Sequence, residues 1–186
     1  PVTGWIMTYP SPKSDKTDVF WDNDPVDAGN TVVRHSNDLN APQSYFGFTA
    51  IKDMGAAFVG TGTIQFRIYL PQNNTASSIY FYNTNGDALI QLQANSSQWI
   101  LNASGDNVTG PSVATNKWIT IQMDVNTDAG YYQIYFDGVS YGTLNFMPNY
   151  GDKFEIARYG LYSWNKSSGL DSKIYFDDLL ILENLN

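Results

Sequence analysis

Alternation of apolar and polar side chains over short stretches is the feature that most constrains the fold of this chain. In GTIQFRIYLP, residues 62–71, Ile64, Phe66 and Ile68 alternate with polar residues. In NKWITIQMDVN, residues 116–126, apolar residues again fill every other position: Ile119, Ile121, Met123 and Val125. A period of two residues is that of a strand with one buried face, and no stretch keeps a helical period over three turns. We therefore predict an all-β chain.

Turn signals separate these alternating stretches. Asn85-Gly86 and Asp137-Gly138 each lie between two apolar runs, and such dipeptides favour tight hairpin turns. Turn formers recur about every 8 to 12 residues, which is the spacing of a sandwich or barrel. The segments 153–164 and 173–182 have the composition of two closing strands.

The N-terminal quarter has a different character. The chain has 186 residues, enough for one domain with a full core, and we expect residues 1–186 to form a single domain. Residues 1–45 are rich in Pro, Asp and Asn, which interrupt regular ladders. We predict an irregular N-terminal arm or wrap there, with only short strands such as residues 31–34.

Charge and composition exclude several classes of function. The net charge is −8, so a phosphate backbone is repelled and nucleic acid is not an expected partner. The chain has no cysteine, which removes thiol catalysis and cysteine-ligated metals. No apolar run approaches the roughly 20 residues of a membrane span, so we expect no membrane insertion. Because the first residue is Pro1, we expect the chain to begin after a removed signal or a cut, in a secreted or cell-surface protein.

Two pairs of segments resemble a known superfamily. WITIQMDVN at 118–126 and YYQIYFDGVSYG at 131–142 resemble paired strands of laminin G-like and concanavalin A-like domains. ARYGLYSW at 157–164 and KIYFDDLLIL at 173–182 resemble the last two strands of jelly-roll polysaccharide lyases and related glucan-active sandwiches. The resemblance implies a concanavalin A-like, two-sheet antiparallel jelly-roll sandwich with a polysaccharide or glycan as partner. Members of the superfamily bind or cleave polysaccharides, act as lectins or serve as adhesion modules, so the role stays open.

Glycoside hydrolysis is the least expected of these activities. It needs two carboxylates that face one substrate. Retaining glucanases of the fold that this chain resembles place them in an E-x-D-x-x-E run, which is absent here. Asp177 and Asp178 are adjacent, and an extended strand would direct them to opposite faces.

Polysaccharide lysis is an alternative that we keep. A lyase needs a Tyr or His base and an Arg that neutralises a uronate carboxylate. The candidates are His35, Arg67, Arg158 and Tyr162. The R-T-E-L-like and Q-I-H-like strands of lyases with this fold are absent, and a solvated strand face has the same composition, so we lean towards a protein without catalysis.

Binding without catalysis needs aromatic platforms and polar neighbours. The apolar face of a sugar packs on an aromatic ring while amides bind its hydroxyls. The candidates are Trp164 and Tyr162 near a polar turn, with Gln65, Arg67 and Tyr69 on one face of a strand. Cross-strand packing on a solvated face would explain the tyrosines equally well. Trp99 and Trp118 begin strands, so we expect both in the core.

Acidic residues suggest a structural calcium ion. Calcium takes six to eight oxygen ligands, and jelly-roll sugar domains, which this chain resembles, often bind one between the N-terminal segment and the last strand. The expected ligands are Asp22, Asp24, Asp27 and Asp178. Local capping of turns by the same residues is the competing explanation.

Five N-x-S/T sequons predict a glycoprotein. They begin at Asn73, Asn95, Asn102, Asn107 and Asn165. The leading hypothesis is an extracellular, non-catalytic, lectin-like carbohydrate-binding module. A second hypothesis is a self-assembling subunit of a surface layer, pilus or filament, whose N-terminal arm pairs with another copy of the chain.

Overall fold

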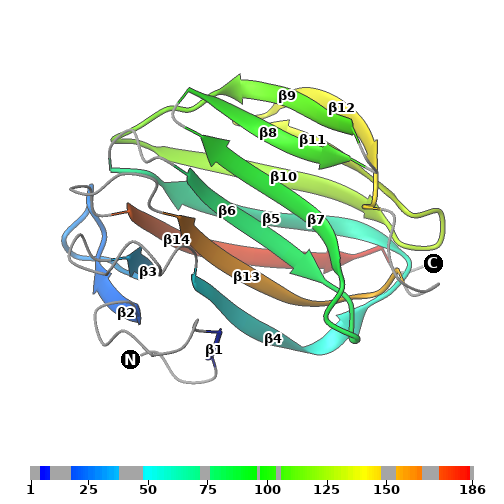
Figure 1. The fold of residues 1–186 in the computed structure, drawn as a ribbon, viewed down its shortest axis with the longest axis horizontal. Coiled ribbons are helices and arrows are strands. Elements are labelled where there is room, and N and C mark those ends of the chain that lie inside the picture. The colour runs from blue at the N-terminus through cyan, green and yellow to red at the C-terminus, as the bar shows by residue number, and fades with distance from the viewer. Residues whose placement is uncertain are drawn as a thin grey trace.

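Two antiparallel β-sheets lie face to face in the computed structural model of the chain, with the apolar core between them (Figure 1). The structure describes residues 5–8, 18–37, 48–71, 76–95, 97–103, 106–147, 154–164 and 172–184. The predicted all-β, two-sheet antiparallel sandwich is confirmed. Within these ranges no helix is long and apolar enough to span a membrane.

The described residues form seven strands in each sheet. Sheet I, in front in Figure 1, has the order β1 (Trp5–Thr8), β4 (Phe48–Phe58), β13 (Ile156–Trp164), β6 (Ala76–Tyr82), β7 (Ala88–Asn95), β8 (Gln98–Ala103) and β9 (Asp106–Ser112). Sheet II has the order β12 (Val139–Asn145), β11 (Tyr131–Phe136), β10 (Trp118–Asn126), β5 (Thr61–Tyr69), β14 (Ser172–Glu183), β3 (Thr31–Asn37) and β2 (Asp18–Asn23).

The strands with the clearest alternation lie at the centre of sheet II. β5 pairs with β10 on one side and with β14 on the other. Ile64, Phe66 and Ile68 of β5 are fully buried, and the residues between them face outward. The apolar residues of β10 are buried in the same way, so the predicted inner faces of both strands are confirmed.

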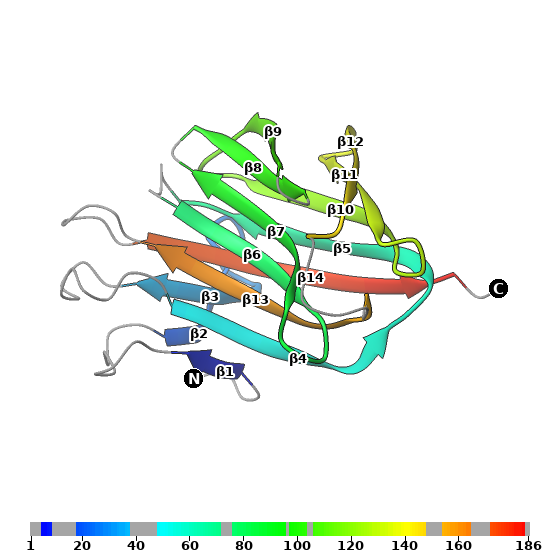
Figure 2. The ribbon, with the colours of Figure 1, turned by 45° about the vertical axis from the view of Figure 1, so that its right-hand side comes forward.

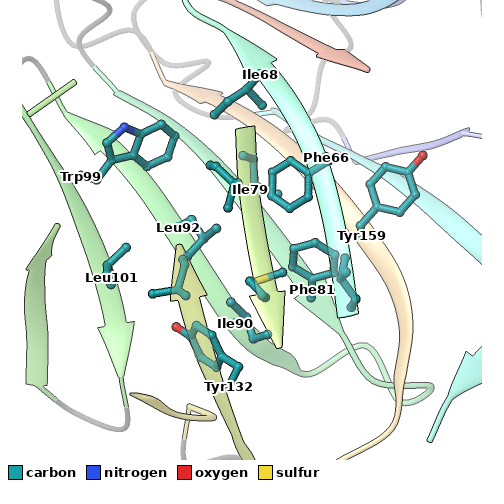
Figure 3. Close-up of a cluster of buried hydrophobic side chains, with 14 of the residues drawn as sticks. Phe66, Ile68, Ile79, Phe81, Ile90, Leu92, Trp99, Leu101, Tyr132 and Tyr159 are labelled. Carbon is teal, nitrogen blue, oxygen red and sulfur yellow. The ribbon is translucent and has the colours of Figure 1, made fainter. Parts of the chain in front are cut away.

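Three aromatic pairs join the two sheets across the core. Phe66 of sheet II lies 5.8 Å, between ring centroids, from Phe81 of sheet I. Trp99 lies 5.3 Å from Phe136, so its expected core position is confirmed. Tyr159 stacks on Phe176 at the same distance, 5.3 Å. Figure 3 shows Phe66, Phe81 and Tyr159 close together among aliphatic side chains from both sheets.

The hairpin signals lie where the sequence predicts turns. Asp137 and Gly138 both have positive φ, 48° and 79°, as the tightest hairpin turn requires, and they join β11 to β12. Gly86, with φ of 91°, ends the turn between β6 and β7.

The described part of the N-terminal segment contains three strands. β1 pairs with β4 at the edge of sheet I, and β2 pairs with β3 at the edge of sheet II. The strand expected at residues 31–34 extends to Asn37. The described part of this arm therefore adds an edge strand to each sheet of its own sandwich, because an extended segment can complete an otherwise open edge.

A bulge in β14 changes the geometry expected for its two adjacent carboxylates. The register with β5 shifts between Asp177 and Leu180, and Asp178 has a φ of 53°. Regular alternation would send Asp177 and Asp178 to opposite faces, but both contact Arg67, at 3.1 Å and 2.6 Å. The expectation of opposite faces was wrong because a bulge interrupts the period of two.

Candidate functional site

The outer side of sheet I presents a cluster of phenols around one arginine. Strands β13, β6 and β7 are neighbours, and alternate residues of each point away from the core. The outward residues are Arg158 and Tyr162 on β13, Tyr80 and Tyr82 on β6, and Gln91 on β7; we call these five residues the tyrosine face. The residues between them, such as Phe81 and Leu161, are fully buried in the core.

The register brings the members of the tyrosine face together. Tyr82 is the partner of Arg158, and Tyr80 is the partner of Gln91. The rings of Tyr80 and Tyr82 stack with centroids 5.6 Å apart. Tyr162 meets Tyr80 edge to face at 6.1 Å. Three rings from two strands thus form one continuous aromatic surface.

These phenols are half-buried although they lie on an outer face. Burial, together with the nearby Tyr162, raises the pKa of Tyr80 to about 12, and a hydrogen bond with Ser78 partly opposes this rise. Burial also raises the pKa of Tyr82 and of Tyr162. All three phenols therefore stay protonated and neutral at physiological pH.

Arg158 contributes a positive charge with little local compensation. Its Nε is buried and has no hydrogen-bond partner in the described part of the chain. The nearest carboxylate oxygen, Oδ2 of Asp53, lies 3.7 Å from Nε, beyond hydrogen-bond distance. Its side chain is 32% exposed, so a ligand oxygen can approach the guanidinium.

The predicted carbohydrate-binding residues divide between opposite faces. Gln65, Arg67 and Tyr69 lie on the outer side of sheet II, because they alternate with the buried apolar residues of β5. Tyr69 is nevertheless buried, with 8% of its surface exposed. Tyr162 lies on the outer side of sheet I. Trp164 ends β13, and its side chain is outside the described residues.

The four residues named for a lyase do not form one site either. Arg158 and Tyr162 share the tyrosine face, but Arg67 lies on the far side of the sandwich. His35, in β3, is fully buried, and burial lowers its pKa to about 4. A neutral histidine inside the core cannot reach a substrate on either outer face.

Arg67 belongs to a packed cluster on the outer side of sheet II. Its guanidinium carbon lies 4.9 Å from the centroid of the Trp118 ring, and that ring lies 5.7 Å from the ring of Tyr69. Trp118 is half-buried on this outer face, not in the core as expected, since it alternates with the buried Ile119. The carboxylates of Asp177 and Asp178 also bind Arg67. Because these contacts occupy its guanidinium, we assign Arg67 a structural role.

The acidic residues expected to bind calcium have other partners. The Asp24 carboxylate accepts hydrogen bonds from Trp118 Nε1 at 2.9 Å and from the backbone of Val26 at 2.8 Å. Burial alone would raise the pKa of Asp24, but these bonds and others outweigh it and lower the pKa.

The other three carboxylates are engaged as well. Asp22 binds Arg34 at 2.6 Å, Asp27 accepts a bond from the backbone of Gly29, and Asp178 binds Arg67. Among the described residues, no group of three or more acidic or histidine side chains gathers to bind a metal. As placed, these residues do not fit a calcium site, and the calcium ion stays a prediction.

The sequons that the structure describes lie on β7, β8 and β9, the three strands at one edge of sheet I. Asn95 ends β7, and its Oδ1 accepts a bond from the backbone of Gln98 at 2.7 Å. Asn107 of β9 is exposed, and the backbone of Asn102 in β8 pairs with it. Asn73 and Asn165 lie outside the described residues. Glycosylation at each stays a prediction.

Sequence reasoning missed Tyr80, Tyr82 and Gln91. The signal was present in SSIYFYN, where tyrosines alternate with Ile79 and Phe81. It was not recognised because alternation does not identify which strands are neighbours, and the cluster forms only when β6 lies between β13 and β7.

Comparisons with known proteins agree on the fold. No family model matches the chain, and no curated protein sequence matches it. A sialidase aligns with a TM-score of 0.72 and 12% identity over 97% of this chain, which corresponds to 17% of the sialidase chain. A glycoside hydrolase family 16 endo-glucanase from Bacteroides ovatus aligns with a TM-score of 0.68 and 12% identity, over 96% of this chain and 94% of its own.

A binding module has the same architecture. The carbohydrate-binding module CBM66 from Bacillus subtilis aligns with a TM-score of 0.57 and 11% identity, over 97% of this chain and 96% of its own. At such identities the likeness establishes the fold alone. The chain has the concanavalin A-like lectin/glucanase fold, which lectins, carbohydrate-binding modules, glycoside hydrolases and lyases share.

Proposed function

We propose that this chain is a non-catalytic carbohydrate-binding module that binds a polysaccharide or glycan on the tyrosine face. The observation that supports this most directly is the group of three half-buried phenols around Arg158 on an outer sheet surface.

The chemistry of the tyrosine face suits a saccharide. Stacked tyrosine rings offer an apolar platform to the C–H face of a sugar ring. Gln91 and the Arg158 guanidinium supply polar groups beside this platform, in the few fixed positions that give a binding site its specificity. Because the side chains lie on adjacent strands of one sheet, little ordering entropy is lost on binding.

Fold relatives support the same class of ligand. The endo-glucanase and CBM66 have names that refer to carbohydrates. The five sequons, together with a polysaccharide ligand, favour a secreted or cell-surface location.

The test is affinity electrophoresis in gels that contain neutral or acidic polysaccharides. We expect retardation by at least one polymer and, for Tyr82→Ala, a loss of affinity of about tenfold or more, equivalent to about 1.4 kcal/mol. Tyr175→Ala is the matched control, since Tyr175 is a half-buried outward tyrosine of sheet II. Equal loss in both variants, or none in Tyr82→Ala, would contradict the proposed site.

Lysis remains the second candidate because Arg158 and Tyr162 share one face. The raised pKa of Tyr162 opposes it, since a phenol that stays protonated is a poor general base at neutral pH. An ultraviolet assay for unsaturated products from alginate or pectate tests this candidate. Product formation that Tyr162→Phe abolishes would replace the binding proposal with a lyase.

Self-assembly remains the third candidate. The arm that was expected to pair with another copy contributes β1 and β2 to its own sheets, which leaves less of it for a neighbour. Sedimentation of the purified chain over a range of concentrations tests this candidate, and growth into filaments would favour it.

A further inference from the structure

A hollow of about 490 Å³ lies on the outer side of sheet II, opposite to the tyrosine face. It extends across β5, β10 and β11 near their ends at the Thr127–Gly130 turn. We name it the sheet II hollow; the lining residues that matter are Thr63, Gln122, Asp124, Asn126, Tyr131 and Gln133. Its volume is within the range of about 300 to 1,000 Å³ typical of ligand sites.

The shape of the hollow follows from the bulge in the neighbouring β11–β12 hairpin. The pairing of β11 with β12 shifts register between Gln133 and Tyr135, and Gly142 on β12 has a φ of 97°. A bulge of this kind increases the local twist of a sheet. Figure 2 shows the yellow β11–β12 hairpin at a steep angle to β5 and β10, so the sheet curls at this corner.

The polar side chains of the hollow are held in place by one another. Asp124 Oδ1 accepts a hydrogen bond from Thr63 Oγ1 at 2.9 Å and another from Gln122 Nε2 at 3.0 Å. Two neighbouring strands, β5 and β10, thus position one carboxylate with an amide and a hydroxyl beside it. Such a set both donates and accepts hydrogen bonds, as adjacent hydroxyl groups of a sugar require.

Tyr131 adds an apolar surface at the margin of the hollow. It is 37% exposed, and Asn126 Nδ2 donates to its phenol oxygen at 3.5 Å. An exposed ring beside amides provides a contact for the C–H face of a sugar.

The negative charge of the hollow and of the chain disfavours anionic ligands. Among the described residues that line the hollow, Asp124 alone is charged, and the chain as a whole has a net charge of −8. Phosphates, sulfates and uronates are therefore repelled, while an uncharged polyol is not.

We propose that the sheet II hollow is a second saccharide-binding site, specific for neutral sugars, on the opposite side of the sandwich from the tyrosine face. The hollow does not need the tyrosine face in order to bind. If both sites bind, one molecule of the protein bridges two polysaccharide chains, and avidity on a dense polymer increases accordingly.

The test uses the whole chain and three neutral polymers, namely laminarin, galactomannan and hydroxyethylcellulose, with alginate as the anionic polymer. The variants are Tyr131→Ala and Gln133→Ala, singly and combined. Thr143→Ala is the matched control, because Thr143 is the exposed neighbour of Gln133 on β12 and does not line the hollow.

We expect the double variant to lose affinity for at least one neutral polymer by tenfold or more, with Thr143→Ala unchanged and unfolding midpoints preserved. Light scattering of that polymer, which rises when the wild-type chain cross-links it, should not rise with the double variant. Retardation of the double variant equal to that of the wild-type chain in every neutral polymer would overturn the inference.

Tyr82→Ala in the same gels separates this inference from the proposed function. Loss in Tyr82→Ala alone overturns the inference and supports the tyrosine face. Loss in the hollow variants alone supports the inference and contradicts the tyrosine face. A wild-type chain that no polymer retards overturns both.

Discussion

Each outer face of the sandwich has an arginine among aromatic side chains, but the two arginines differ in their ion pairs. On sheet II, Arg67 has two carboxylates within 3.1 Å and the Trp118 ring beneath it. On sheet I, the carboxylate of Asp53 is the one that pairs with Arg158 among the described residues, at 3.7 Å, and Tyr82 lies beside Arg158 on the next strand. Nε of both arginines is buried without a hydrogen-bond partner among the described residues, so the two differ in their ion pairs: two close carboxylates hold Arg67, and one more distant carboxylate lies beside Arg158. The sequence motif around each arginine does not show this difference.

Among the variants that test this comparison, we expect Trp118→Ala to have the largest effect, and the effect is on stability. In Trp118→Ala, the contacts to Arg67 and Tyr69 and the hydrogen bond to Asp24 are lost together. We expect the free energy of unfolding to fall by about 3 kcal/mol, measured by denaturant titration. Tyr82→Ala on sheet I should cost clearly less, and equal losses would contradict the contrast.

The next effect is acid sensitivity in the sheet II half of the core. The pKa of His35 falls from 6.5 to about 4 on folding, so the unfolded chain takes up a proton first as the pH falls. Above pH 6.5, His35 makes its full contribution to the free energy of unfolding. As the pH falls from 6.5 to 4, this contribution is lost, which amounts to about 3 kcal/mol for a pKa shift of that size.

Unfolding midpoints at pH 7 and pH 4.5 measure the effect of His35. His35→Gln should be less stable at pH 7 but lose less on acidification. A variant with the same pH dependence as the wild-type chain would show that other groups cause the acid sensitivity.

A smaller effect distinguishes the two arginines directly. Arg67→Ala should reduce the free energy of unfolding by about 1 kcal/mol, since partly exposed ion pairs and cation–π contacts contribute modestly. Arg158→Ala should change stability very little and weaken polysaccharide binding. The paired measurements are denaturant titration and affinity electrophoresis, and the reverse outcome would reject the assignment of roles.

Calcium should have the smallest effect. The four candidate carboxylates are engaged by Arg34, Arg67, Trp118 and backbone amides, so few oxygens remain for the six to eight that calcium needs. We expect the melting temperature to differ by less than about 2 °C between calcium and a chelator. A rise of about 5 °C or more with calcium would show that these residues rearrange around the ion.

The sequence by itself determined the strands with clear alternation, such as β5 and β10, together with their buried faces and the tightest turns. Ile64, Phe66 and Ile68 alternate because a strand exposes successive residues to opposite sides, and Asp137-Gly138 turns because its backbone tolerates positive φ. These are local properties, so they can be read from neighbouring residues.

Only the tertiary structure decided which side chains share a surface. β5 and β13 have similar patterns but lie in different sheets, so Arg67 and Tyr162 are on opposite sides of the molecule. The bulge at Asp178 likewise depends on the register of β14 against β5. Strand pairing joins residues far apart in the chain, and a period of two does not specify the partner. For that physical reason the candidate sites appear only when the sheets are assembled.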